Sequence, residues 1–82
     1  MIELKDTIEL MTSADYKDRL MAEYWQTKIR YDKLETMMIK YGAGTLGFEP
    51  TCSAELLDAQ MRYMSDYIRC LRIRAEIEGI EL

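Results

Sequence analysis

Two clusters of aromatic and basic residues are the parts of this sequence best suited to bind a charged ligand. The first extends over residues 16–30, and the second is a group of arginines within residues 69–74. Flat side chains beside Lys and Arg can stack on a nucleobase while the cations contact its phosphates. Arg in particular makes bidentate contacts with phosphate oxygens. The candidate ligand-binding residues are Tyr16, Lys17, Tyr24, Trp25, Lys28, Arg69, Arg72 and Arg74.

Each cluster also has a structural interpretation. Tyr24 and Trp25 are of the types that are enriched at subunit interfaces, and on residue types alone this interpretation is favoured. Cations near the C-terminal end of a helix stabilise the helix dipole, which would account for the arginines without any ligand.

The residue types needed for most catalytic sites are missing. The chain has no His, so neither a Ser-His-Asp nor a Cys-His arrangement can form. Its two cysteines, Cys52 and Cys70, lack the spacing of zinc ligands and are expected to be free thiols. The glycines after Tyr41 follow a predicted helix and precede no Lys-Ser/Thr, so they resemble a phosphate-binding loop only superficially and helix capping explains them better. We therefore expect a binding protein with no catalytic residue, metal or cofactor, and not an enzyme.

Length and charge restrict the function further. The 82 residues are enough for one domain, residues 1–82, and the net charge of −4 disfavours DNA binding, which needs a basic surface. Charged residues occupy the start of the chain, where a signal peptide would be apolar, and no apolar run could span a bilayer. These features predict a cytoplasmic protein that acts on neither DNA nor membranes.

The spacing of apolar residues predicts the elements that must position the two clusters. We expect a short helix over residues 3–11, with Leu4, Ile8 and Met11 on its apolar face, and long helices over 14–41 and 53–78. The apolar face of the first long helix is Leu20, Tyr24, Thr27, Tyr31, Leu34, Met38 and Tyr41. Such spacing is typical of helices that cross at a shallow angle, so the fold class is all-α, a long antiparallel helix hairpin.

The connection over residues 42–53 is the only long loop expected. Gly42 follows the last apolar residue of the helix and is predicted to cap it. Leu46 and Phe48 are expected to be buried inside this loop.

The last helix has more apolar surface than a hairpin can cover. One face carries Leu57, Met61, Met64, Ile68, Leu71 and Ala75, and a second carries Leu56, Gln60, Tyr63, Tyr67, Cys70, Ile73 and Ile77. Cys70 is expected to be a small core residue. The helix therefore needs another neighbour, the N-terminal helix, another subunit or both, and a homo-oligomer is expected. Whether residues 1–12 dock on their own hairpin or on a neighbour is left open.

Three segments carry a resemblance to a known family. They are residues 16–28 (YKDRLMAEYWQTK), 41–52 (YGAGTLGFEPTC) and 74–82 (RAEIEGIEL). Over residues 14–82 the chain resembles a family of small proteins from gut phages and prophages that is described as related to a crAss-like phage protein.

A more distant similarity concerns the order helix, Phe-containing loop and helix, with residues 56–67 (LLDAQMRYMSDY) in the second helix. This layout is similar to the helical-hairpin domain of phage anti-CBASS and anti-Thoeris sponges. The resemblance implies a homo-oligomer, typically a hexamer, that sequesters cyclic di- or trinucleotides or cyclic ADP-ribose-type immune signals without cleaving them in the infected bacterial cell. It also implies Tyr16, Lys28 and Arg74 as ligand groups.

Two functions are therefore expected. The first is an anti-defence sponge for cyclic nucleotide signals. The alternative is a protein-interaction module whose apolar face and Trp25 dock onto a host or phage protein, for which the methionine-rich helices are suited.

Overall fold

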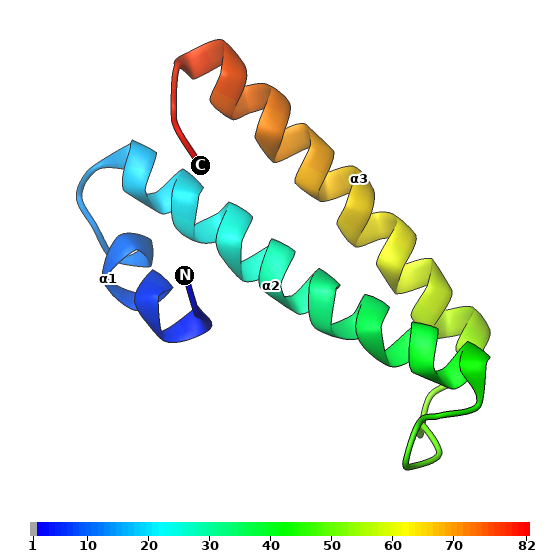
Figure 1. Ribbon diagram of the computed structural model, residues 1–82. Coiled ribbons are helices and arrows are strands. Elements are labelled where there is room, and N and C mark those ends of the chain that lie inside the picture. Colours follow the sequence, from blue (N-terminus) through cyan, green and yellow to red (C-terminus); the bar gives the residue numbers. More distant parts are fainter. Residues whose placement is uncertain (1) are drawn as a thin grey trace.

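The computed structural model describes residues 2–82. A 3₁₀ turn, η1 (Leu4–Asp6), leads directly into the short helix α1 (Thr7–Met11), and two long helices follow, α2 (Tyr16–Ala43) and α3 (Ala54–Glu78). The last two helices run antiparallel and pack as a hairpin (Figure 1). The predicted all-helical hairpin is confirmed.

Short polar side chains begin both long helices. The Asp15 carboxylate accepts a hydrogen bond from the Lys17 backbone N–H, and the Ser53 hydroxyl accepts one from the Leu56 backbone N–H. Each bond satisfies a donor that has no partner within the helix. The first long helix therefore begins at residue 16 instead of 14, because Asp15 is its cap.

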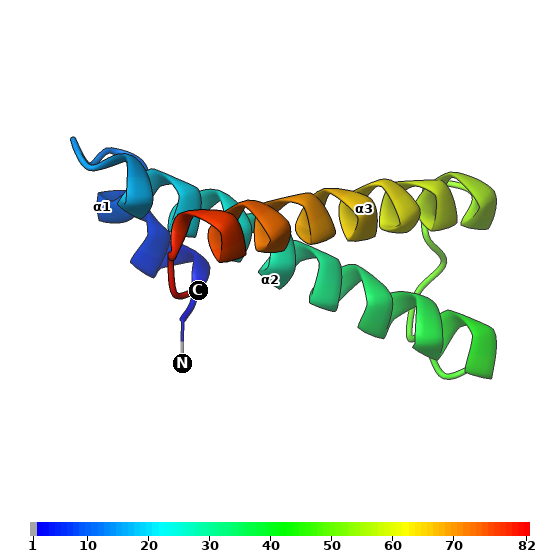
Figure 2. The ribbon, with the colours of Figure 1, turned by 90° about the horizontal axis from the view of Figure 1, so that it is seen from above.

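The hydrophobic core lies at one end of the hairpin. Its buried residues are Leu20, Tyr24, Ile68, Leu71, Ala75 and Ile80, with Leu71 completely inaccessible to solvent. Toward the loop the helices diverge, as the view from above shows (Figure 2), and no residue from 25 to 67 is buried. The core is thus closed by the chain segment that follows α3, whereas the loop end of the hairpin is open.

Residues 2–12 dock on their own hairpin, against α2 (Figure 1). The buried residue of this segment is Thr7, whose hydroxyl donates to the Leu4 carbonyl at 2.7 Å and accepts from the Gln26 side chain at 3.1 Å. The predicted contact face was wrong, because Ile8 and Met11 are exposed. Because α1 is only five residues long, it has no extended apolar face. The hydrogen bonds of the buried Thr7 fix the orientation of α1 against α2 instead.

The loop between α2 and α3 does not bury its aromatic residue. Phe48 is 59% exposed and Leu46 is half-buried, so the expectation of two buried loop residues was wrong for Phe48. No residue from 25 to 67 is buried, so this end of the hairpin has no closed interior for the Phe48 ring to enter.

Both cysteines are free and exposed, so Cys70 is not the core residue that its apolar neighbours suggested. It lies on the second apolar face of α3, and nothing in residues 2–82 covers that face.

Within residues 2–82 no helix has the length and hydrophobicity needed to cross a membrane.

The end of α2 provides a matched pair of substitutions. Gly44, not Gly42, is the C-cap, with φ at +77°, a left-handed conformation that costs any residue with a Cβ about 1 kcal/mol. Gly42 lies inside the helix, and a Cβ added there would meet nothing within 4 Å. We expect Gly44→Ala to lower the free energy of unfolding by about 1 kcal/mol and Gly42→Ala to raise it by about 0.5–1 kcal/mol. Urea denaturation of both variants checks this, and equal signs for the two would contradict the assignment of the cap.

Candidate anion-binding site

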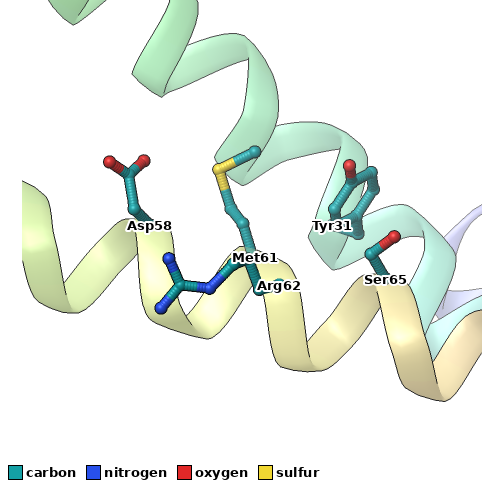
Figure 3. Close-up of a pocket in the computed structure, with 5 residues that line it drawn as sticks. All are labelled: Tyr31, Asp58, Met61, Arg62 and Ser65. Carbon is teal, nitrogen blue, oxygen red and sulfur yellow. The ribbon is translucent and has the colours of Figure 1, made fainter.

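A shallow groove runs along one side of the hairpin between the two long helices. It consists of two adjoining hollows that share Tyr31 from α2 and Ser65 from α3, with volumes of about 370 and 300 Å³. We call it the α2–α3 groove, and its lining residues are Lys28, Tyr31, Asp58, Met61, Arg62, Ser65, Ile68, Arg69 and Arg72. The close-up of the larger hollow shows Met61 directed toward α2, with Tyr31 and Ser65 facing one another beyond it (Figure 3).

The groove brings three of the predicted ligand residues together. Lys28 extends from α2, while Arg69 and Arg72 extend from successive turns of α3. Neither arginine forms an ion pair with a carboxylate in residues 2–82. Two guanidinium groups without a carboxylate partner leave their donors available to an incoming anion, which they can bind in bidentate geometry.

Hydrogen bonds to carboxylates stabilise the protonated forms of Lys28 and Tyr31 in the groove. The Lys28 ammonium donates to Asp32 at 2.9 Å, and this hydrogen bond raises the pKa of Lys28 above its ordinary value of 10.5. The Tyr31 hydroxyl donates to Glu35 at 3.1 Å, which raises the pKa of Tyr31 above 10.0. Lys28 is therefore cationic and Tyr31 neutral at physiological pH. The Lys28–Asp32 pair is partly exposed, so solvent screens it and a phosphate can compete for the ammonium.

A second polar cluster lies on the other side of the hairpin. Tyr16 accepts a hydrogen bond from the Arg74 guanidinium and donates one to Glu78 at 3.1 Å, while the Arg74 Nε lies 4.0 Å from the same carboxylate. The hydrogen bond to Tyr16 is the main cause that raises the pKa of Arg74. Arg72 and Arg74 are two residues apart, which on a helix turns their side chains roughly 200° from one another. Tyr16 and Arg74 thus meet as a pair, but away from Lys28.

The remaining predicted residues lie elsewhere. Tyr24 is buried in the core, where its ring meets Trp25 edge to face with centroids 5.1 Å apart. Trp25 is half-buried and lines a separate hollow against residues 2–5, and Lys17 is exposed on the first turn of α2. None of these three contributes to the α2–α3 groove.

Four polar residues of the groove were not among the predicted ligand residues, namely Tyr31, Asp58, Arg62 and Ser65. Tyr31 was assigned to the apolar face of its helix, although its position three residues after Lys28 places both side chains on neighbouring parts of one surface. The Lys28 ammonium indeed lies 5.9 Å from the centre of the Tyr31 ring. Arg62 precedes Arg69 by seven residues, two helical turns, and that spacing was the available signal.

The fold and the groove define this protein as a helical hairpin with a cation-lined surface groove and a half-buried tyrosine at its centre. The chain belongs to the Sequestin family, whose family model matches residues 14–77. The matched region contains both long helices up to the last turn of α3, all eight predicted ligand residues and the whole groove. Searches of curated proteins and of solved structures returned no match.

Proposed function

We propose that this protein binds a small phosphate-bearing signal, of the cyclic nucleotide or cyclic ADP-ribose type, and sequesters it without cleaving it. The name of its family suggests the sequestering of a molecule, which is consistent with such a sponge. The observation that carries the proposal is the convergence of Lys28, Arg69 and Arg72 on one groove beside Tyr31.

The charge of the groove suits a ligand with two phosphates. Arg69 and Arg72 lie on successive turns of α3, so they can each contact a different phosphate, with Lys28 facing them from α2. Asp58 lies at the far end of the groove, and Asp32 and Glu35 are bound to Lys28 and Tyr31. Glu76 lines a neighbouring hollow with Arg69 and Arg72 but does not line the groove, so the anion-binding region is confined to the part around these two arginines. This confinement explains how a chain of net charge −4 could bind an anion.

Sequestration needs no further chemical group. A binder expressed in excess of its ligand lowers the free concentration of that ligand by mass action alone. In an infected bacterial cell, such a protein would keep a cyclic nucleotide signal below the level that activates its receptor.

A ligand panel tests the proposal. The purified protein is heated with cyclic di- and trinucleotides and cyclic ADP-ribose isomers, each in turn. A ligand present at a hundred times its Kd adds about 2.7 kcal/mol to the free energy of unfolding, and for a chain of this size the melting temperature should rise by on the order of 10 °C.

The same samples distinguish sequestration from cleavage. After heat denaturation of the complex, chromatography should recover the bound ligand intact, with linear ADP-ribose and linear nucleotides as reference compounds. No melting shift with any member of the panel would contradict the proposed ligand class, and recovery of a cleaved product would contradict binding without cleavage.

A further inference from the structure

The outer face of α3 carries a long row of apolar side chains that nothing in residues 2–82 covers. It carries Leu56, Tyr63, Tyr67, Cys70, Ile73 and Ile77, all exposed, and we call it the α3 stripe. Ile77 is 78% and Tyr63 71% exposed. From first to last residue the stripe covers 21 helical steps, roughly 32 Å at 1.5 Å per residue.

The area of the α3 stripe is unusual for a chain of this size. Two exposed tyrosines and three exposed aliphatic side chains present on the order of 500 Å², near the upper end of the largest patch found on a typical monomer. A stripe that pairs with an identical stripe would bury about twice that area, on the order of 1,000 Å², which reaches the lower limit for a specific interface.

The charges of α3 favour an antiparallel partner of the same sequence. Residues 55–66 hold three carboxylates and one guanidinium, whereas residues 69–78 hold three guanidiniums and two carboxylates. The first half is therefore net negative and the second net positive. Two copies of α3 placed antiparallel bring unlike halves together, and a parallel arrangement would bring like halves together.

We infer that a second copy of this chain docks on the α3 stripe and forms a twofold-symmetric, antiparallel α3–α3 dimer. A twofold interface uses the same patch on both copies, and this symmetry is the commonest among soluble oligomers. With the axis through the middle of the stripe, between residues 66 and 67, Tyr63 of each copy lies opposite Cys70 of the other. Arg69 and Arg72 lie at the edge of this interface, where they line a hollow with Ile73 of the stripe, and on the side of α2 they line the α2–α3 groove.

Light scattering after size-exclusion chromatography tests the dimer on the full chain at about 50 μM. The wild-type protein should have twice the mass of one chain, and Tyr67→Lys, at the centre of the stripe, should have the mass of one. Ile39→Lys is the matched control, because Ile39 is 65% exposed on α2 and lies outside the stripe. Circular dichroism should show equal helix content in the three proteins. A monomeric wild type, or a Tyr67→Lys variant that still forms dimers, would overturn the inference.

Cysteine crosslinking tests the antiparallel arrangement. The variant Cys52→Ser retains Cys70 alone, and antiparallel pairing would hold the two copies of Cys70 about 10 Å apart along the helix axis, too far for a disulfide. Addition of Tyr63→Cys should then give a covalent dimer under mild oxidation, since positions 63 and 70 face one another across the axis. Crosslinking of Cys52→Ser without the second substitution would show a parallel arrangement and would contradict the model of the interface.

The inference does not depend on the proposed ligand. Arg69→Ala/Arg72→Ala should leave the mass of the dimer unchanged, and Tyr67→Lys should leave the groove intact. A monomeric wild type that binds a ligand of the panel would show that only the dimer inference has failed, and a dimeric wild type that binds none of them would show that only the proposed ligand class has failed.

Discussion

Replacement of both groove arginines, Arg69→Ala/Arg72→Ala, should weaken ligand binding by roughly 100-fold. A hydrogen bond to a charged group contributes about 1.5–3 kcal/mol, and because the groove is open to solvent we expect the lower figure for each guanidinium, or about 3 kcal/mol for the pair. Isothermal titration calorimetry with the ligand identified by the panel measures this loss directly.

The control for charge is Arg30→Ala/Lys40→Ala. Like the groove variant, it removes two positive charges from a chain of net charge −4, but at exposed positions outside the groove. This variant should bind within about threefold of the wild type, because exposed charges at a distance are screened by salt. An equal loss in both double variants would show that binding depends on overall charge and not on the groove.

The variant Arg74→Ala tests which of the two polar clusters binds the ligand. Arg74 is already bound to Tyr16 and lies beside Glu78, so its removal should have little effect if the groove is the site. Abolished binding in Arg74→Ala, together with normal binding in Arg69→Ala/Arg72→Ala, would move the site to the Tyr16–Arg74 cluster, the position that the resemblance to phage sponges implied.

The largest effect on stability is expected from Leu71→Ala. Leu71 is fully buried at the centre of the core, between Leu20 and Tyr24 of α2 and the segment around Ile80. Truncation of such a side chain removes its transfer free energy and leaves a cavity, at a cost of about 3–4 kcal/mol. A chain of this size has a total of only several kcal/mol of stability, so the variant should be largely unfolded on mild heating.

Chemical denaturation at a fixed protein concentration measures the effect, because self-association would make the stability concentration-dependent. Ile39→Ala is the matched control, with an expected change below about 0.5 kcal/mol since its side chain is mostly in water. A similar small change for Leu71→Ala would mean that the core is held together elsewhere.

The hairpin could be predicted because its signals are local and repeated. Apolar residues at alternating intervals of three and four define one face of each long helix, and the glycines of residues 42–47 mark the break between them. The inner face of α3 was also predicted correctly at Ile68, Leu71 and Ala75, which are buried. These features require no knowledge of how the helices meet.

The groove could not be predicted in full because it depends on the pairing of two helices. Ser65 and Tyr31 are 34 residues apart, and only the angle at which α2 crosses α3 brings them to the same hollow. Aromatic residues near cations in the sequence suggested a stacking site, yet Tyr24 is part of the core while Tyr31 lines the groove. Tyr24 and Tyr31 are seven residues apart on the same face of α2, so they differ in their position along the hairpin and not in the direction they face. Tyr24 lies at the end that holds the core, and Tyr31 lies in the stretch without buried residues, a difference that residue spacing does not reveal.

The error at Phe48 has the same origin. An apolar residue in a loop is usually buried when the flanking helices provide an interior for it. Here α2 and α3 separate before they reach the loop, so the position of Phe48 is decided by a long-range feature of the fold.

The buried residues of the core lie at one end of the hairpin, so the two ends of the groove should differ in local stability. Local opening of a protein requires least free energy where few side chains are buried, and in this hairpin that region is the loop end. The end of the groove at Asp58 and Arg62 lies in that region, whereas Arg69 and Arg72 flank the fully buried Leu71. In the proposed complex, the end at Arg69 and Arg72 would anchor a phosphate rigidly, while the other end could widen to admit ligands of different size without disturbance of the core.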